Sequence, residues 1–409
     1  MTELRAAEDQ QAVIVSSALD HAVTRLTLTD FRCYQSLRLE IDAVPVVLTG
    51  ANGAGKTNLL EAVSFLAPGR GLRRAKLAEV GRIGTVGPWG VSATVCTLER
   101  KTEVGTAVDA PIGEAQTSSH PERQDAESVD EGGNQRRVVK IDGAIETQSA
   151  LAEVLSISWL VPQMDRLFIE GTNGRRVFFD RLAFGFDPDH SKRIGAYERV
   201  LRQRSRLLRE GVRDPGWLAV LEETMAEHAV AIGATRCDTL ARLESGLAMS
   251  RGEFPGVQLE LDGWVEKCLE GEPALAVEGK LRERWAASRE VDAAAGRTSI
   301  GVHRTDLLAR HGDTDTPAAQ CSTGEQKALL LAIVLAQGRV LAARQGHPPI
   351  FLLDEVIAHL DEARRQALFE ELLAMRAQAW LSGTDPTPFA PLRGHAHFMS
   401  VAESRVSSA

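Results

Sequence analysis

The stretch Gly50-Ala51-Asn52-Gly53-Ala54-Gly55-Lys56-Thr57 decides the fold, because it fits the pattern GxxxxGK[ST]. The residues before it, 44–49, form a near-continuous apolar run that is typical of a buried strand. The residues after it, KTNLLEAVSFLA, have the pattern of a helix that ends before Pro68-Gly69. A strand, a glycine-rich turn and a helix therefore follow one another, as a phosphate-binding loop requires. The alternative interpretation is an ordinary glycine-rich turn.

The chemistry of this loop points to a nucleoside triphosphate. Glycines allow successive backbone N–H groups to face one anion, and the N-terminus of the following helix adds a partial positive charge. We expect Lys56 to bridge the β- and γ-phosphates and the Thr57 hydroxyl to bind Mg²⁺. All residues from Gly50 to Thr57 are therefore candidate ATP-binding residues, and ATP with Mg²⁺ is the expected ligand.

An acidic pair follows a buried strand near the other end of the chain, in the segment IFLLDE at residues 350–355. A nucleotide site of this kind needs a carboxylate for magnesium at the end of a buried strand beside the loop. Asp354 is the candidate for that ion, and Glu355 is the candidate to orient or deprotonate the attacking water. Together with Lys56 they are the expected catalytic residues. A helix-capping role is the alternative for such a pair.

A third element, Cys321-Ser-Thr-Gly-Glu-Gln-Lys327, leads into the apolar run ALLLAIVLA, which we expect to be a buried helix. Ser322 with Glu325 three residues later has the pattern of a capping box. A capped helix start that contains glycine is also an anion site, so it can meet a γ-phosphate. Both interpretations stand, and they are compatible.

The remaining pattern predicts an α/β fold: an ATPase head with a mixed sheet and flanking helices, split by an inserted, mainly helical arm. Residues 24–41 predict a hairpin, and VSATVCTLER and RRVVKIDGAI predict strands. Residues 102–135 between them contain no aromatic residue and are rich in polar residues, so we expect a disordered surface insertion. The expected domains are 1–185 for the N-terminal part of the head, 186–296 for the arm and 297–409 for the C-terminal part.

Composition limits the possible function. The net charge of −9 disfavours nucleic-acid binding by bulk charge, so any DNA contact must use a local patch. Five scattered cysteines without CxxC spacing favour a reducing cytoplasm, without a disulfide framework or zinc site. The longest apolar run is far shorter than the roughly 20 residues of a membrane span, and the N-terminus shows no export signal. We therefore expect no membrane association.

Several segments together resemble the RecF family of ABC/SMC-type ATPases. They are LTLTDFRCYQSLRLEI, GANGAGKTNLLEAVSFL with GRGLR behind it, RLFIEGTNGRRVFFDR, YERVLRQRSRLL, TSIGVHRTDL, CSTGEQKALLLA and IFLLDEVIAHLD. The separation of Lys56 from Ser322 is too long for a compact transporter cassette and too short for an SMC coiled coil. The segment GVHRTDL departs from the family pattern at Val302 and Thr305, and the insertion at 102–135 is unusual for the family.

The resemblance implies an ATP-dependent DNA-binding protein of recombinational repair. Such a protein forms an ATP-sandwiched homodimer on gapped or single-stranded DNA, works with RecO- and RecR-like partners to load the recombinase, and is released by slow, DNA-dependent ATP hydrolysis. It also implies that Ser322, Gly324 and Gln326 contact the nucleotide of the other protomer.

The resemblance assigns roles to further residues by position. Arg32 lies near the phosphates and Asn52 on the γ-phosphate side, although Arg32 can also be a plain surface arginine. Asp361 matches a dimer-interface loop, with a helix N-cap as its alternative. Thr384 takes the place of a γ-phosphate switch residue, and Gln163 is a further candidate on the magnesium side.

Candidate DNA contacts are arginines and lysines in and around a basic segment. From Lys192 to Arg213 there are eight Lys or Arg against Glu198 and Glu210. A charge run on a helix is also often a solvated face, or it packs the arm, so these alternatives stay open. The candidates are Arg175, Arg176, Arg181, Lys192, Arg193, Arg202 and Arg206.

Two other functions compete with this prediction. The chain can be an ATP-gated DNA scaffold with little hydrolysis, in which Glu355 has a structural role. It can also be a cassette ATPase coupled to a membrane transporter, which the length of the arm already disfavours.

Overall fold

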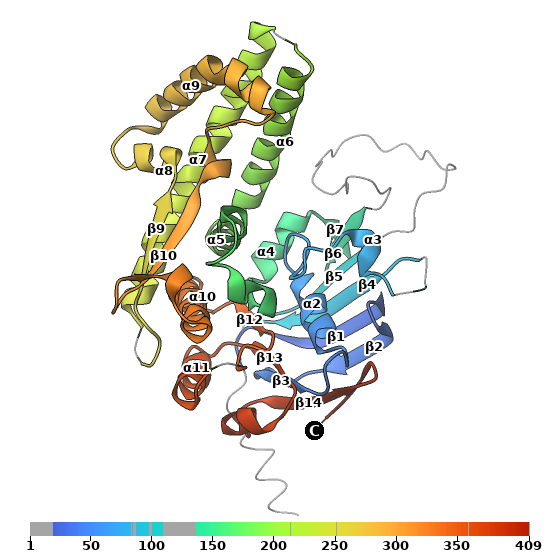
Figure 1. The fold of residues 1–409 in the computed structure, drawn as a ribbon. Helices are drawn as coiled ribbons and strands as arrows, with labels where there is room; N and C mark the ends of the chain where they lie inside the picture. Colours follow the sequence, from blue (N-terminus) through green and yellow to red (C-terminus); the bar gives the residue numbers. More distant parts are fainter. Residues whose placement is uncertain are drawn as a thin grey trace, which may run out of the picture. The chain divides into compact units, whose positions relative to one another are not determined.

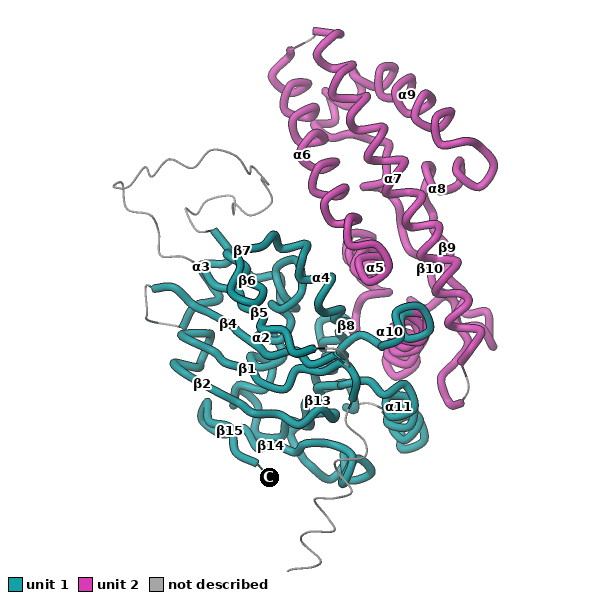
Figure 2. The backbone as a smooth tube through the Cα atoms, turned by 180° about the vertical axis from the view of Figure 1, so that it is seen from behind, with its two compact units in different colours: residues 1–164, 341–409 teal, residues 165–340 magenta. Residues whose placement is uncertain are grey.

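The computed structural model describes residues 19–408 except 83, 85, 86, 98, 99, 109–135, 213, 251 and 359. Within this part, the chain forms two compact units, which Figure 2 shows in different colours. Unit 1 contains residues up to 164 together with 341–409, and unit 2 contains 165–340. The division expected from the sequence stays a prediction, and its middle segment, 186–296, is shorter than unit 2.

A six-stranded sheet with a parallel centre forms the base of unit 1 (Figure 1). Its order is β15-β14-β3-β13-β12-β8, and β3 pairs in parallel with both β13 and β14. These strands come from both ends of the chain, so the expected split α/β head is confirmed. The strands are β3 Val46–Thr49, β8 Ile157–Leu160, β12 Ile350–Leu353, β13 Ala379–Gly383, β14 His397–Ala402 and β15 Arg405–Ser408.

A second, antiparallel sheet of unit 1 has the order β2-β1-β4-β5-β6-β7. The predicted hairpin is confirmed, because β1 pairs with β2 from Arg25 opposite Glu40 to Phe31 opposite Tyr34. The alternating apolar residues of β1 face a core that the strand shares with helix α2 Lys56–Ser64. The strands are β1 Ala22–Phe31, β2 Tyr34–Glu40, β4 Gly90–Cys96, β5 Lys101–Val108, β6 Arg137–Ile141 and β7 Ala144–Glu146.

The insertion predicted at 102–135 is wrong at its beginning. Residues 102–108 belong to β5, which pairs with β4 on one side and β6 on the other. Every second side chain of β5, from Thr102 to Val108, is buried. The absence of aromatic residues misled the prediction, because valine and threonine in alternation are sufficient to pack one face of a strand. The rest of the predicted insertion, 109–135, lies outside the described residues.

The remaining helices of unit 1 are short apart from α11 Glu362–Ala374. They are α3 Leu77–Val80 and α4 Leu151–Val154, with 3₁₀ turns η2 Gln148–Ala150, η3 Pro162–Arg166 and η6 Thr387–Leu392. The turn η3 ends in unit 2, at Arg166.

Long helices dominate unit 2, as expected for an arm. The long helices are α5 Thr172–Phe186, α6 His190–Arg209, α7 Pro215–Ala248 and α9 Ala274–Ala295. The short elements are α8 Trp264–Leu269 and the 3₁₀ turns η4 Val302–Arg304 and η5 Ala318–Gln320. A small antiparallel sheet, β11-β10-β9, was not predicted; it contains β9 Val257–Asp262, β10 Asp306–His311 and β11 Thr316–Pro317. A core around Met225, Leu281 and Trp285 joins the helices.

Helix α10, Thr323–Gln345, contains the predicted buried run and passes from unit 2 into unit 1. It is the one helix of the described chain that is long and apolar enough to cross a membrane by length and composition. Of its most apolar window, 83% is buried inside the protein, which is the behaviour of a core helix.

Candidate functional site

The glycine-rich loop lies between β3 and α2 of unit 1, as predicted. Gly50, Gly53 and Gly55 have φ values of 148°, 80° and 117°. A Cβ on Gly50 would lie 2.1 Å from the Val401 carbonyl oxygen, and one on Gly55 would lie 2.5 Å from the Tyr34 hydroxyl. The backbone therefore approaches its neighbours so closely at two positions that only glycine fits.

Lys56 is folded back on this loop. Its Nζ donates hydrogen bonds to the carbonyl oxygens of Gly50 at 2.7 Å and Ala51 at 2.9 Å. Burial lowers the pKa of Lys56, while Glu355 and Asp354 oppose that shift. The helix that begins at Lys56 has no side-chain cap, because its N-cap is Gly55. A cation and the N–H groups of an uncapped helix start are thus gathered at one place, which is the arrangement of an anion site.

Thr57 and Asp354 meet, although they are far apart in sequence. The Thr57 Oγ1 lies 2.9 Å from Oδ2 and 3.1 Å from Oδ1 of Asp354. Asp354 follows β12 and is 3% exposed, and its N–H donates to the Leu160 carbonyl of the neighbouring β8. The parallel register of β12 with β8 thus fixes where this carboxylate leaves the sheet.

This pair fits magnesium by its donor chemistry. A hydroxyl and a carboxylate are hard oxygen ligands, which Mg²⁺ prefers. No group of three or more His, Cys, Asp or Glu side chains that could hold a metal occurs among the residues that the structure describes. Mg²⁺ usually takes one or two protein ligands together with substrate phosphates and water.

Glu355 adopts an unusual backbone conformation directly after Asp354. Its φ is 51°, in the left-handed region that non-glycine residues rarely occupy. Glu355, Asn52 and Thr384 line one pocket of about 200 Å³. Asn52 and Thr384, which the resemblance placed on the γ-phosphate side, and Glu355, the candidate to act on the attacking water, therefore surround one space. A strained conformation at such a pocket is typical of functional sites.

Arg32 is held by an acidic residue that the sequence analysis missed. Its Nη2 and Nε lie 2.6 and 2.8 Å from the two carboxylate oxygens of Glu61, on the helix that follows the loop. Glu61 is completely buried and also pairs with Arg73 at 2.7 Å. Arg32 is therefore more than a plain surface arginine, and its side chain is fixed against α2. Its expected contact with phosphate stays a prediction.

Ser322, Gly324 and Gln326 lie in unit 2 at the start of α10. The Ser322 Oγ and N–H both lie 2.8 Å from the Glu325 carboxylate, so the predicted capping box is confirmed. Gln326 is buried, and its Nε2 donates to the Cys321 carbonyl at 2.8 Å. The predicted contact with a nucleotide of another protomer stays a prediction.

Asp361 is the N-cap of α11, which is the alternative that its sequence context left open. Its Oδ1 accepts a hydrogen bond from the N–H of Arg364 at 2.8 Å. Gln163 lies exposed in the 3₁₀ turn after β8. An N-cap does not exclude an interface role for Asp361, and the expected roles of both residues stay predictions.

The candidate DNA contacts fall into two groups. Arg175 and Arg193 are engaged inside unit 2: Arg175 binds both oxygens of Asp306 at 2.8 Å, and Arg193 pairs with Asp187. Burial, and then Arg236, lowers the pKa of Arg176. Arg181 lies over the Phe178 ring, 5.4 Å from its centroid. The remaining candidates, Lys192, Arg202 and Arg206, have exposed side chains that pair with acidic residues three or four positions away on or next to α6.

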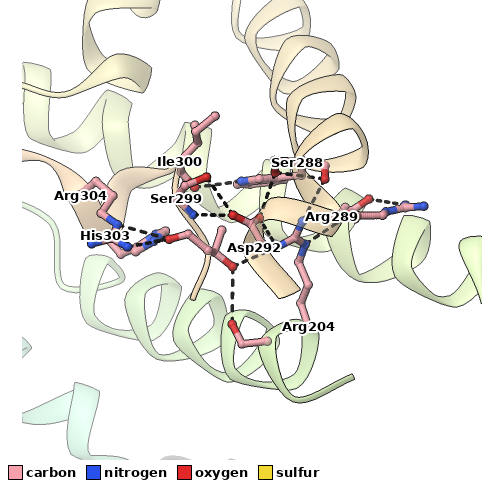
Figure 3. Close-up of polar contacts among 12 residues, drawn as sticks. Arg204, Ser288, Arg289, Asp292, Ser299, Ile300, His303 and Arg304 are labelled. Carbon is pink, nitrogen blue, oxygen red and sulfur yellow. Dashed lines mark hydrogen bonds and ion pairs between the residues drawn. The ribbon is translucent and has the colours of Figure 1, made fainter. Parts of the chain in front are cut away.

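The basic run also contains a completely buried arginine, Arg204. Its side chain binds Asp292 at 2.8 Å (Figure 3). Glu222 is its second acidic partner, at 2.9 Å. It also donates to Thr298 and to the Trp285 carbonyl. For this arginine the interpretation that the run packs the arm is correct.

His303 shares a partner with Arg204, because both side chains form hydrogen bonds with Thr298. Its Nε2 donates to the Thr298 carbonyl, which can only accept, so its Nδ1 accepts from the Tyr197 hydroxyl at 2.7 Å. Burial lowers the pKa of His303 to about 4, so it is neutral at physiological pH. The segment GVHRTDL therefore packs within unit 2.

Ser382 was not found from the sequence. Its hydroxyl lies 2.6 Å from Asp354 Oδ1 and 2.9 Å from the backbone nitrogen of Glu355. The available signal was a serine at the end of an apolar run, AWLSG, beside a predicted acidic strand. A single sequence does not reveal that β13 pairs with β12, so this signal was insufficient.

Comparison with known proteins places these features in a family. Residues 22–382 match the family described as the RecF/RecN/SMC N terminal domain. A DNA replication and repair protein RecF from Rhizobium meliloti (strain 1021) is 43% identical over 388 residues, covering 94% of this chain and 98% of that protein. One of the same name from Mesorhizobium japonicum is 42% identical over 387 residues, covering 94% and 97%.

Solved structures support the fold. One described as the recombination mediator protein RecF-ATPrS in the RecFOR pathway has a TM-score of 0.77 at 20% identity, covering 96% of this chain and 99% of that chain. An SMC head domain from Pyrococcus furiosus with an extended coiled coil has a TM-score of 0.51 at 15% identity, covering 95% and 96%. The fold is thus that of an ABC/SMC-type head. With the match across most of its length, this chain belongs to the RecF family of DNA replication and repair proteins.

Proposed function

We propose that this chain is an ATP-binding and ATP-hydrolysing protein of DNA replication and recombinational repair, whose ATP-bound dimer holds DNA. The observation that carries the proposal is the contact of Thr57 with Asp354 beside Lys56, because it assembles both halves of a phosphate site from opposite ends of the chain. The relatives named DNA replication and repair protein RecF, and the RecF structure described with ATPrS, support it.

The residues divide the work of binding ATP and Mg²⁺. The loop N–H groups and Lys56 receive the β- and γ-phosphates once Lys56 leaves the Gly50 and Ala51 carbonyls. Thr57 and Asp354, whose side chains already meet at 2.9 Å, would hold Mg²⁺. When bound, Mg²⁺ neutralises charge on the phosphate oxygens. Because burial already lowers the pKa of Lys56, a bound triphosphate restores a favourable environment for its charge.

Glu355 activates the water. In hydrolysis, the water oxygen forms a bond to the γ-phosphorus, and the bond from that phosphorus to the bridging oxygen breaks to release ADP. Glu355 orients the attacking water or accepts its proton, and phosphate is the second product. The pocket that Glu355 shares with Asn52 and Thr384 is the place for this water.

The proposed dimer and the proposed DNA contact rest on the resemblance to the RecF family. Ser322, Gly324 and Gln326 of one protomer contact the nucleotide of the other, because a glycine-containing, capped helix start can accept a phosphate. Lys192, Arg202 and Arg206 are the arginines and lysine best placed for DNA, since their side chains are exposed. Their paired glutamates and aspartate weaken that contact and make it dependent on salt.

RecO- and RecR-like proteins are the proposed partners, and the cytoplasm is the proposed compartment. The description of the RecF structure as part of the RecFOR pathway supports the partnership. ATP binding would favour the DNA-holding dimer and hydrolysis would release it, so turnover need only be slow.

Glu355→Gln tests this proposal against the scaffold alternative. Glutamine keeps the shape of the side chain but cannot accept the proton, so the variant should bind ATP, lose hydrolysis and accumulate ATP-held dimers. Hydrolysis and light scattering are measured with and without gapped duplex DNA. Glu362→Gln, in the first turn of α11, is a matched control that should keep normal turnover. If the Glu355 variant hydrolyses ATP as well as the unchanged protein, the assignment of Glu355 is wrong.

A further inference from the structure

Ser382 is a buried hydroxyl at the junction of the two halves of the site. It lies in β13, a strand whose residues are all buried, and is 1% exposed. The register pairs Leu381 with Leu353, the last residue before Asp354, and Ser382 with Leu48 of β3. The strand with Ser382 thus runs between the strand that leads to the glycine-rich loop and the strand that leads to the acidic pair.

The hydroxyl satisfies two different groups at once. Its hydrogen can be donated only to Asp354, whose Oδ1 lies at 2.6 Å, because a backbone N–H is itself a donor. Its oxygen then accepts the N–H of Glu355 at 2.9 Å. The short distance to Asp354 is typical of a hydrogen bond to an ionised carboxylate. One side chain therefore connects the magnesium-side carboxylate with the backbone of the water-activating residue.

The second bond stabilises a conformation that is otherwise unfavourable. Glu355 has a φ of 51°, and a non-glycine residue in this region persists only when its surroundings hold it. The bond from its N–H to Ser382 is such a restraint. Because this backbone sets where the Glu355 side chain leaves the chain, it also sets its position at the pocket with Asn52 and Thr384.

The first bond orients Asp354 toward Thr57. Ser382 contacts Oδ1, and the nearer oxygen of Asp354 to Thr57 is Oδ2, at 2.9 Å. A carboxylate held from one side by Ser382 cannot rotate freely, so the other oxygen stays directed at the Thr57 hydroxyl. Precise placement of ligands by their neighbours is what a magnesium site demands, because the ion requires near-octahedral geometry.

We propose that Ser382 is a positioning residue for ATP hydrolysis, which fixes Asp354 for magnesium and Glu355 for the water through one hydroxyl. The inference rests on the proposed ATP hydrolysis. The Ser382 hydroxyl is engaged by Asp354 and by the Glu355 N–H, so its loss should leave Mg²⁺-free nucleotide binding intact and lower the rate of turnover.

The test compares Ser382→Ala, Ser382→Cys and Ser382→Thr. Loss of a hydrogen bond to a charged group lowers kcat by about ten- to a hundredfold in the alanine and cysteine variants. The KM for ATP and the Mg²⁺-free dissociation constant of a fluorescent ATP analogue change less, by about threefold at most. Threonine keeps the hydroxyl and suits a strand, so it restores turnover.

The readouts separate positioning from folding. Binding of the fluorescent analogue with and without Mg²⁺ shows whether the affinity gained from Mg²⁺ shrinks in the alanine variant, as Asp354 misplacement predicts. Ser158→Ala is the matched control, because Ser158 is a similarly buried serine on β8 of the same sheet, opposite Phe351. The Ser158→Ala variant should keep kcat within about twofold, because Ser158 pairs with Phe351, which lies three residues before Asp354 and therefore away from the acidic pair. The cysteine variant, nearly equal in size to serine, keeps the packing and serves if the threonine variant folds poorly.

The outcomes are distinct. If the unchanged protein binds but does not hydrolyse ATP, the proposed function fails and this inference fails with it. If the unchanged protein hydrolyses ATP but Ser382→Ala keeps full kcat, only the role of Ser382 is overturned. The role is also overturned if a folded threonine variant is as slow as the alanine variant, or if Ser158→Ala loses as much kcat.

Discussion

Arg204→Met should destabilise unit 2 by breaking its central buried ion network. Arg204 is completely buried, and methionine retains much of its aliphatic volume while removing every donor (Figure 3). Glu222 keeps two hydrogen bonds from Arg289. Asp292 keeps only neutral partners, from Ser288 and Ser299, and so becomes a buried charge without a cation.

The expected magnitude follows from these remaining partners. Removing one partner of a buried pair costs about 3–5 kcal/mol, and the partial rescue of Glu222 by Arg289 puts the value near the lower end, at about 3 kcal/mol. Arg202→Met is the matched control on the same helix, because its pair with Glu198 is 3.7 Å long and exposed on both sides. That exposed pair contributes less than about 0.5 kcal/mol.

The pH dependence supplies a second check. Burial alone would raise the pKa of Asp292, but Arg204 and the two serines outweigh it and hold the pKa below 3.8. A depressed pKa contributes stability above the unfolded pKa, and that contribution is lost as the pH falls through the folded pKa. Without Arg204 the pKa of Asp292 rises, so protonation at lower pH removes the unpaired buried charge of the variant. The loss of unfolding free energy relative to the unchanged protein should therefore be smaller at pH 5 than at pH 7.

Urea unfolding followed by circular dichroism and tryptophan fluorescence measures both variants. Trp285, whose carbonyl accepts from Arg204, is one of the six tryptophans that contribute to the fluorescence. ATP binding by unit 1 should persist in the Arg204 variant. The account of the network is refuted if Arg204→Met unfolds at the same urea concentration as Arg202→Met, or if its deficit grows as the pH is lowered from 7 to 5.

Three further perturbations have defined outcomes. Lys56→Met should abolish binding of a fluorescent ATP analogue and ATP-dependent dimerisation, with an unchanged circular dichroism spectrum, because its present partners are loop carbonyls; retained binding would contradict its role. In urea unfolding, Gly50→Ala should lower the free energy of unfolding by about 2 kcal/mol or more, since its Cβ would meet the Val401 carbonyl. Gly53→Ala, with open space around the new Cβ, should lower it by about 1 kcal/mol. Equal losses in the two variants would refute the steric argument. Asp180→Asn should lower the free energy of unfolding by about 2 kcal/mol at pH 7, because burial raises the pKa of Asp180 but Arg236 and His190 outweigh burial and hold the pKa at about 2. This loss of stability should stay constant down to about pH 4 and become smaller only below that pH. A loss that already becomes smaller between pH 7 and pH 5 would contradict the assignment.

The sequence was sufficient for features that depend on local pattern. The strand, glycine loop and helix around Lys56, the hairpin that begins near Arg25 and the strand before Asp354 were all predicted, because apolar periodicity and glycine spacing are visible in one segment. The position of Asp354 beside the loop was also expected, since the loop chemistry demands a carboxylate at a neighbouring strand end.

Features that depend on long-range pairing were not visible. Ser382 acquires its role only because β13 lies beside β12, and Glu61 only because the hairpin turn brings Arg32 to α2. In the sequence Arg204 is one of several basic residues that suggest a charged surface, yet in the structure it is completely buried. The sequence alone does not distinguish a buried arginine from an exposed one. Burial and partner identity are properties of tertiary packing, which no local pattern determines.

The most direct test of the central claim is ATP hydrolysis by the purified chain, with and without gapped duplex DNA, together with light scattering of the nucleotide-bound protein. The account predicts slow hydrolysis that DNA stimulates and an ATP-dependent shift from monomer to dimer, both lost in Lys56→Met. ATP binding without stimulation by DNA and without dimerisation would contradict it, and would favour a scaffold or a transporter-coupled ATPase.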